Sequence, residues 1–129
     1  MPTAVTEGIR VSVHSTYLED RSAPEEGSFA FAYQVTIANE GHGRVQLMRR
    51  HWIITDGNGE VREVEGPGVV GEQPVLNAGE EHQYTSGAVL TTPVGTMEGS
   101  YEMHEPDGRV FRAKTVSYTH LTLPTILRV

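Results

Sequence analysis

Hydrophobic and polar residues alternate along much of the chain, and a period of two is typical of β-strands that bury one face. The clearest run spans residues 29–39, where every second side chain from Phe29 to Ile37 is apolar. Residues 9–14 alternate in the same way. We therefore expect both segments to be strands with one face in a hydrophobic core.

Residues 44–55 are also expected to be extended, but their alternation slips between Met48 and His51. One extra residue in a strand produces such a slip, so we predict a β-bulge or a bend there. The next four residues, 56–59, read Asp-Gly-Asn-Gly. These residue types tolerate positive φ, and the segment is therefore predicted to be a hairpin turn.

Further short strands are predicted at regular intervals, separated by turns rich in Gly, Pro, Asn and Asp. No segment has a helical period long enough to connect parallel strands. The pattern therefore predicts an all-β fold, an antiparallel β-sandwich of the immunoglobulin or fibronectin type III kind. These additional strands are expected at 62–64, 82–90, 99–103 and 109–114. The predicted core contains Val11, Val13, Phe29, Phe31, Tyr33, Val35, Ile37, Leu47, Trp52, Ile54, Tyr84 and Tyr101.

The composition narrows the classes of protein that fit. The chain has 129 residues, enough for one domain with its own core. It contains no cysteine, which excludes disulfides and thiolate metal sites, so a cytoplasmic location is expected. No signal peptide or membrane-spanning apolar run is visible, and we expect no membrane partner. The net charge of −7 opposes binding to phosphate backbones, so no nucleic-acid partner is expected either.

One segment has the spacing of a phosphate-binding loop. Residues 66–71 read Gly-Pro-Gly-Val-Val-Gly, a GxGxxG sequence. In dinucleotide-binding proteins a helix follows this loop and places its N-terminus against the pyrophosphate, whereas Pro74 and strand-like flanks leave no room for a helix here. We interpret the segment as a connection between strands. Binding of a small anion at Gly66, Gly68 and Gly71 remains the alternative.

Two adjacent cations, Arg49 and Arg50, lie next to the only tryptophan, Trp52. Such a cluster is suited to bind an anion or the carboxylate of a partner. In the alternative interpretation, which we favour, Trp52 belongs to the core and the arginine stems cover apolar surface. The two arginines join the three glycines as candidate ligand-binding residues.

The sequence shows no pattern typical of a catalytic or metal site. Its six histidines have no HxH or HExxH spacing, which a local transition-metal site would need. Ser86 lacks the Gly-x-Ser-x-Gly elbow of a nucleophilic serine. We therefore expect a protein that is not an enzyme, with no catalytic residue, no metal ligand and no cofactor.

The Gly-rich segment, with Arg50–Asp56 before it and Tyr84–Gly87 after it, closely resembles the ApaG family of small bacterial β-sandwich proteins. The resemblance covers residues from about 6 to 114, and we expect residues 1–114 to form one ApaG-like domain. Residues 115–129 depart from the family, whose chains usually continue with an Ile-Pro-x-Phe-x-Leu strand. Our hypothesis is that these residues are an atypical and non-native C-terminal tail. Its Thr, Val, Tyr, Leu and Ile favour extended structure, so docking as an additional strand is the alternative for the tail.

The resemblance implies a fibronectin type III-like sandwich, a homodimer and an association with cobalt and magnesium tolerance, for which the family is also called CorD. ApaG-like domains also occur within F-box proteins and a DNA-polymerase-delta-interacting protein, which implies a role in recognition. We therefore expect a non-catalytic module that binds a protein partner of unknown identity. The alternatives are a small-anion or nucleotide and pyrophosphate sensor at the GxGxxG segment, and a divalent-metal-handling factor.

Overall fold

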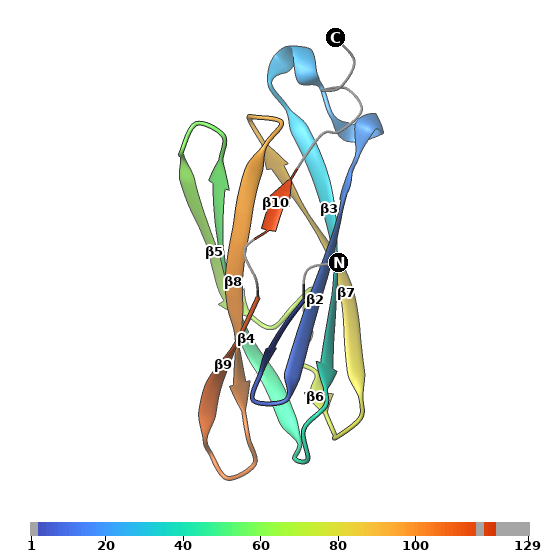
Figure 1. The fold of residues 1–129 in the computed structure, drawn as a ribbon, viewed down its shortest axis with the longest axis vertical. Coiled ribbons are helices and arrows are strands. Elements are labelled where there is room, and N and C mark those ends of the chain that lie inside the picture. Colours follow the sequence, from blue (N-terminus) through green and yellow to red (C-terminus); the bar gives the residue numbers. More distant parts are fainter. Residues whose placement is uncertain (1–2, 116–117, 121–129) are drawn as a thin grey trace.

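The computed structural model describes residues 3–115 and 118–120, the last three by their backbone alone. Two antiparallel sheets pack face to face (Figure 1), which confirms the predicted all-β sandwich. In the described part of the chain, no helix is long and apolar enough to cross a membrane. The strands are β1 (Thr3–Thr6), β2 (Ile9–Tyr17), β3 (Phe29–Asn39), β4 (Val45–Asp56), β5 (Val61–Pro67), β6 (Val75–Leu76), β7 (Glu81–Leu90), β8 (Gly95–His104), β9 (Val110–Lys114) and β10 (Tyr118–His120). Two 3-10 turns, η1 (Glu19–Arg21) and η2 (Pro24–Glu26), lie between β2 and β3.

The strand order leaves the two long sides of the sandwich different. One sheet has the order β1-β2-β3-β7, and the other has the order β10-β8-β4-β5, with β6 added to β4 and β9 added to β8. On one long side β1 contacts β9, and the two sheets are joined there by a hydrogen bond from Lys114 N to Thr6 Oγ1 of 3.3 Å and by an ion pair between Arg109 and Glu7. On the other long side lie the edge strands β5 and β7. We call these the β1–β9 side and the β5–β7 side.

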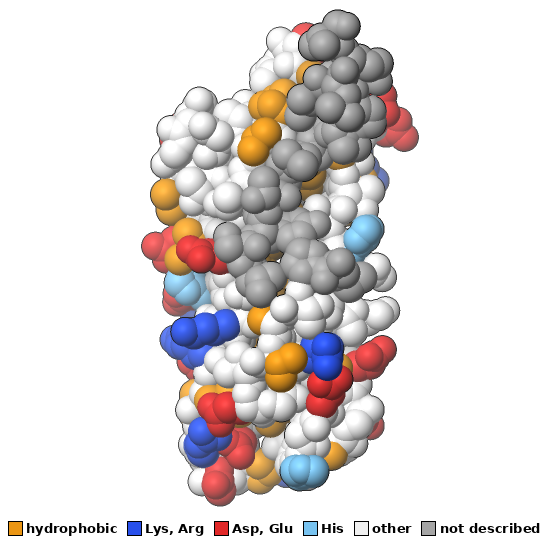
Figure 2. Space-filling model, in the orientation of Figure 1, with side chains coloured by type: hydrophobic (Ala, Val, Ile, Leu, Met, Phe, Trp, Pro, Cys, Tyr) orange, Lys and Arg blue, Asp and Glu red, His pale blue; other side chains and the backbone are white. Residues whose placement is uncertain are grey.

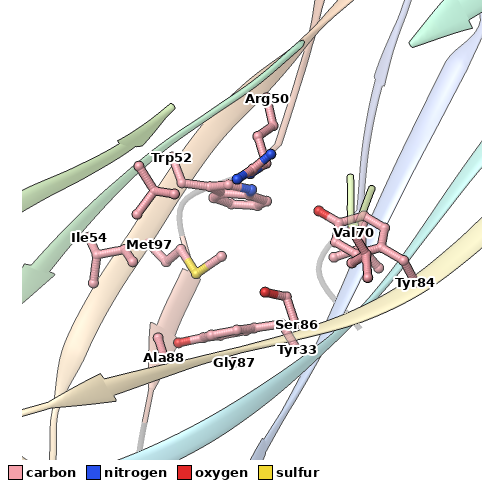
Figure 3. Close-up of a pocket in the computed structure, with 12 residues that line it drawn as sticks. Tyr33, Arg50, Trp52, Ile54, Val70, Tyr84, Ser86, Gly87, Ala88 and Met97 are labelled. Carbon is pink, nitrogen blue, oxygen red and sulfur yellow. The ribbon is translucent and has the colours of Figure 1, made fainter. Parts of the chain in front are cut away.

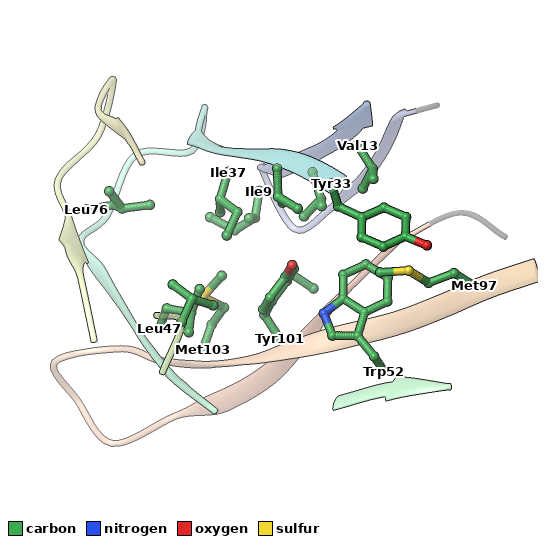
Figure 4. Close-up of a cluster of buried hydrophobic side chains, with 14 of the residues drawn as sticks. Ile9, Val13, Tyr33, Ile37, Leu47, Trp52, Leu76, Met97, Tyr101 and Met103 are labelled. Atoms are coloured by element: carbon green, nitrogen blue, oxygen red, sulfur yellow. The ribbon is translucent and has the colours of Figure 1, made fainter. Parts of the chain in front are cut away.

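The core fills the space between the sheets with the inward residues of each alternating strand (Figure 4). Tyr84 of β7 and Tyr101 of β8 join the two sheets by a hydrogen bond of 2.5 Å between their hydroxyl groups. The Tyr101 ring also meets Trp52 edge-on, at 5.9 Å between centroids. Burial raises the pKa of Tyr84 and raises that of Tyr101 well above the ordinary value, so both phenols stay neutral. Ten of the twelve predicted core residues are buried, and Phe29 and Tyr84 are only partly buried but pack against the core.

The predicted strands are present, with some differences in length. The run 29–39 is a strand over its whole predicted length, and residues 56–60 form the predicted hairpin turn, in which Gly59 N donates to the Asp56 carbonyl over 3.0 Å. Strands β1 and β6 were not predicted, because four and two residues are too few to show an alternation. Of the tail, residues 118–120 pair with β8, while residues 116–117 and 121–129 lie outside the described residues.

Candidate functional site

A β-bulge in β4 decides which arginine points into the sandwich. The pairing of β4 with β8 shifts in register between Leu47 and Arg49, so Met48 is the extra residue. Leu47 is buried before the bulge, and after it Arg50 and Trp52 line a space between the sheets. Without the extra residue, strand alternation would place Arg49 on the inner face instead. The predicted bulge is therefore confirmed, and it directs Arg50 inward.

Residues 66–74, the end of β5 and its connection to β6, are here called the Gly-rich loop, and β4 holds their backbone. Gly68 N donates to the Met48 carbonyl over 2.8 Å, so the bulged residue anchors the loop. Arg50 Nη1 donates to the carbonyls of Pro67 and Gly68 over 3.1 and 3.0 Å. A phosphate-binding loop presents free N–H groups to its ligand. This loop instead presents carbonyl oxygens to an arginine and uses the Gly68 amide within the fold.

A strained two-residue turn forms the tip of the Gly-rich loop. Val69 N donates to the Glu72 carbonyl over 2.8 Å and Glu72 N returns a bond of 3.0 Å, while the central residues Val70 and Gly71 have φ of +47° and +80°. Positive φ at both positions defines a type I′ turn, which favours Asn-Gly or Gly-Gly. A β-branched residue there is a genuine outlier. Val70 is also 63% exposed, so little burial offsets its strain.

A cavity of about 180 Å³ lies between the sheets on the β5–β7 side (Figure 3). Arg50 enters it from β4, Val70 from the Gly-rich loop, and Tyr84 and Ser86 from β7. A second hollow of about 550 Å³ shares wall residues with the cavity, and we call the two together the groove. The groove is lined by Leu18, Arg21, Ala30, Phe31, Tyr33, Val35, Arg50, Trp52, Ile54, Arg62, Val64, Val70, Tyr84, Ser86, Gly87, Ala88, Val89 and Met97.

The groove carries positive charge in a protein whose net charge is −7. Arg21, Arg50 and Arg62 line it, and none of its lining residues is acidic. In the part of the chain that the structure describes, the ion pairs of arginine involve Arg10, Arg49 and Arg109 and not these three. The groove therefore presents three arginines that form no ion pair with a described carboxylate. Acidic residues lie nearby, since Asp56 and Glu60 line an adjoining hollow with Arg62, and Glu65 and Glu102 line another with Arg50.

The two predicted arginines lie on opposite faces of the sheet. Arg49 pairs with Glu65 on the outer face at 3.5 Å, beside a contact of 2.8 Å between His51 and Glu63. Acidic and basic side chains are likewise interspersed on the face shown in Figure 2. Such exposed pairs contribute little to stability. Of the two arginines, only Arg50 reaches the groove between the sheets.

The structure also places the three predicted glycines. Gly66 lies opposite Arg50, and a Cβ there would come within 3.3 Å of both guanidinium nitrogens, so the missing side chain leaves room for the cation. Gly68 has φ +60°, and a Cβ there would lie 2.2 Å from the Glu72 carbonyl oxygen. Gly71 completes the turn after Val70. Gly66, Gly68 and Arg50 come together, while Gly71 lies at the tip of the loop and Arg49 lies apart.

Most groove residues, among them Arg62 and Val70, were not predicted as site residues from the sequence. Arg62 pairs with Ile54 and lies two residues before Val64, so strand alternation places it on the inner face. That signal was available in the spacing from Val64. Val70 gave no such signal, because nothing in a valine indicates positive φ, and only the glycine after it suggests a turn.

The described residues form neither a cluster of metal ligands nor a pairing of Ser86 with a general base. No group of three or more His, Asp or Glu among them is placed to hold a metal ion. Ser86 lines the groove, but no histidine or carboxylate lines it with Ser86 to act as a general base. What the site can do is bind apolar groups through its walls and anionic groups through its arginines.

Comparison with known proteins places this site in a family. The sequence model of the ApaG domain matches residues 19–105. The chain belongs to the ApaG domain family. The matched residues include β3 to β8, so Arg50 and the Gly-rich loop lie within the ApaG domain.

Individual relatives match over most of their length. Protein ApaG of Klebsiella pneumoniae (strain 342) is 53% identical over 117 residues, which cover 91% of this chain and 93% of that protein. Protein ApaG of Pseudomonas fluorescens (strain Pf0-1) is 56% identical over 105 residues, which cover 81% and 83%. Neither relative is named for a reaction.

Solved structures support the same assignment. The crystal structure of an ApaA protein from Bordetella pertussis has a TM-score of 0.87 at 41% identity and covers 95% of this chain and 97% of its own. The C-terminal domain of wzt has a TM-score of 0.57 at 11% identity, covers 93% of this chain and 77% of its own, and shares the fold alone.

Proposed function

We propose that this ApaG domain is a non-catalytic protein-interaction module that receives its partner in the groove on the β5–β7 side. The observation that carries the proposal is the contrast between the two long sides. The β1–β9 side is joined by contacts between the sheets, whereas the β5–β7 side, which Arg62 Nη2 crosses with a bond of 3.3 Å to the Val89 carbonyl, also has a groove with apolar walls. Val89 at the groove is 53% exposed, so apolar surface there is available for burial by a partner.

Three finer features complete the proposal. The sandwich is of the immunoglobulin or fibronectin type III kind, supported by the chain's repeated crossing between sheets, from β3 to β4 and from β6 to β7. The protein forms a homodimer in the cytoplasm, supported by unpaired edge strands. Its association with cobalt and magnesium tolerance is indirect and acts through the bound partner, since the described residues offer no metal site.

Site-specific photo-crosslinking tests the proposed module. A photoreactive amino acid replaces Val89 in the groove, and the matched control replaces Val110 of β9, which is 50% exposed. In a bacterial lysate we expect discrete adducts with a protein from position 89 and none from position 110. Equal adducts from both positions, or none from either, would contradict the proposal.

The second candidate function is binding of a small anion such as pyrophosphate. Its supporting observation is Arg50, which lies beside the Gly-rich loop and forms no ion pair among the described residues. A thermal-shift screen with nucleotides, pyrophosphate, Co²⁺ and Mg²⁺ tests this function and direct metal binding together. A ligand at a hundred times its Kd should add about 2.7 kcal/mol to the free energy of unfolding. Stabilisation by pyrophosphate that disappears in Arg50→Gln would favour the anion sensor, whereas stabilisation by the metal ions alone would favour metal handling.

A further inference from the structure

We propose that the groove binds an extended peptide segment in which two carboxylates, four residues apart, flank an apolar side chain. The carboxylates meet Arg50 and Arg62, and the apolar side chain lies over the wall between them. This inference rests on the proposed function and adds the chemistry of the partner. Four observations support it, namely the spacing of the arginines, the surface between them, their place in the sheet and the strain at Val70.

The spacing of the two arginines matches an extended chain. In the pairing of β4 with β5, Arg50 lies opposite Gly66 and Arg62 lies opposite Ile54. The backbone positions of the two arginines are therefore four apart along the paired strands, about 13 Å at ~3.3 Å per residue. The guanidinium of Arg50 bonds to the Gly68 carbonyl and that of Arg62 to the Val89 carbonyl, and each retains other N–H groups for a carboxylate. In an extended peptide, side chains i, i+2 and i+4 lie on one face with the same rise. Residues i and i+4 can thus each reach one arginine.

The surface between the arginines is apolar. Trp52 and Val64 are directly paired midway between them and both line the cavity. On the opposite wall Ala88 of β7 lines both hollows. Residue i+2 of the bound segment would lie over the pair of Trp52 and Val64, so an apolar side chain is favoured there.

The place of the arginines in the sheet argues for a ligand. Inward-pointing charges on edge strands protect a sheet from pairing with another chain, and this protection accounts for Arg62 on the edge strand β5. It does not account for Arg50, because β4 is flanked by β5 and β8. Arg50 is turned inward by a bulge, a device that re-aims side chains beside binding sites.

The strained backbone at Val70 also indicates a ligand-binding site. Asn would suit the first position of this type I′ turn, whereas the valine there is strained and exposed. Residues held in such conformations cluster at ligand-binding sites. A bound segment would bury the Val70 side chain, which lines the cavity on the side of Tyr84, across from Trp52 (Figure 3).

Trp52 provides the signal for the test, because it is the only tryptophan and lines the cavity. The probes are three pools of acetylated and amidated pentapeptides with Thr at positions 2 and 4 and Val, Ile, Leu or Phe at position 3. Both end positions carry Glu in the first pool, Gln in the second and Lys in the third. At physiological salt we expect the Glu pool to change Trp52 emission at about tenfold lower concentration than the Gln pool, and the Lys pool to bind most weakly.

Three variants locate the binding. Arg62→Gln should weaken binding of the Glu pool several-fold, while Arg112→Gln should leave it unchanged, because Arg112 lies outside the groove and also forms no ion pair among the described residues. Val70→Asn should weaken binding of all pools and raise the melting temperature. Circular dichroism checks that each variant is folded, and a higher melting temperature excludes misfolding as the cause of weaker binding.

Several outcomes would overturn the inference. These are a Glu pool that gives no saturating change, pools that bind equally, or Arg62→Gln and Arg112→Gln with equal effects. A change that acetate or pyrophosphate alone reproduces at the same concentrations would assign the groove to small anions. A change that follows protein concentration without peptide would assign it to a second copy of the chain. If crosslinks form at position 89 while the peptide titrations stay flat, this inference fails and the proposed function stands.

Discussion

Single residues in the Gly-rich loop show how backbone geometry alone can produce a spacing that resembles a phosphate-binding motif. Gly68 cannot carry a side chain without meeting the Glu72 carbonyl, and Gly66 leaves space for the Arg50 guanidinium. Gly71 occupies the second central position of a type I′ turn. Each glycine of the GxGxxG spacing therefore has a structural reason in this fold, and the cation beside them is held by two carbonyls of the loop.

Substitution of Gly68 separates a structural role from a binding role. Gly68→Ala should lower the free energy of unfolding by about 2 kcal/mol or more, because a positive φ and a backbone clash act together. Gly71→Ala is the matched control in the same loop, since it has φ +80° but nothing within 4 Å of its Cβ. Its expected cost is about 1 kcal/mol. Urea unfolding measures both, and equal costs would show that the close approach of the Glu72 carbonyl does not matter for stability.

The residues around Met48 and Val70 differ in how far their conformation could be predicted from the sequence. The slip in alternation at Met48 predicted the bulge, because an inserted residue changes the parity of every later side chain. The choice between Arg49 and Arg50 follows from the same parity. The conformation of Val70 could not be predicted, because its positive φ is imposed by the hydrogen-bonded turn around it.

Among the elements, the hairpin between β4 and β5 depends on one carboxylate. Asp56 Oδ1 accepts hydrogen bonds from Asn58 N over 2.8 Å and Glu60 N over 2.9 Å, and Oδ2 accepts one from Thr91 Oγ1 over 3.2 Å. The backbone bond from Glu60 is the largest of the effects that lower the pKa of Asp56. The hairpin that carries Arg62 is therefore stabilised by an ionised side chain.

Acid should weaken this hairpin. Because the folded pKa of Asp56 lies below the unfolded value near 3.8, its contribution is present above that value and is lost as the pH falls through the folded pKa. Asp56→Asn should lower stability at pH 7 and make the fall in stability below pH ~4 less steep. Asp107→Asn, in the turn between β8 and β9, is the control. An acid profile for Asp56→Asn parallel to that of the unchanged protein would contradict the prediction.

Element boundaries were predictable where periodicity was long. The eleven-residue alternation of β3 identified the whole strand, while the two-residue β6 forms only because β4 offers it a partner. Pairing between distant segments is set by tertiary contacts that a local pattern does not contain. For the same reason, the sequence indicated a sandwich but not the groove, which depends on which strands end up at the edges.

On the scale of the whole molecule, the edge strands govern association. The exposed Val5 on β1, and the edges of β5 and β7 that no other described strand covers, favour contact with a second copy. We therefore predict a dimer at micromolar concentration by sedimentation equilibrium. Val5→Lys should weaken the dimer if β1 forms the contact, and Val89→Lys should weaken it if β7 does. A monomer at every concentration up to about 100 micromolar would contradict the prediction.

The ties along the β1–β9 side have a consequence for how the molecule opens. Thr6, Glu7, Arg109 and Lys114 connect the sheets there, whereas on the β5–β7 side the hydroxyl bond between Tyr84 and Tyr101 and a bond of 3.3 Å from Arg62 Nη2 to the Val89 carbonyl connect them. We expect local separation of the sheets to begin on the β5–β7 side, with loss of the exposed Arg62 bond as its first step. Backbone amides of β5 and β7 should then exchange with deuterated solvent before those of β2 and β8. If the sheets separate on the β5–β7 side alone, a partner larger than the groove can enter without global unfolding. The stability of the contacts on the β1–β9 side then limits how far the sheets can separate on the β5–β7 side.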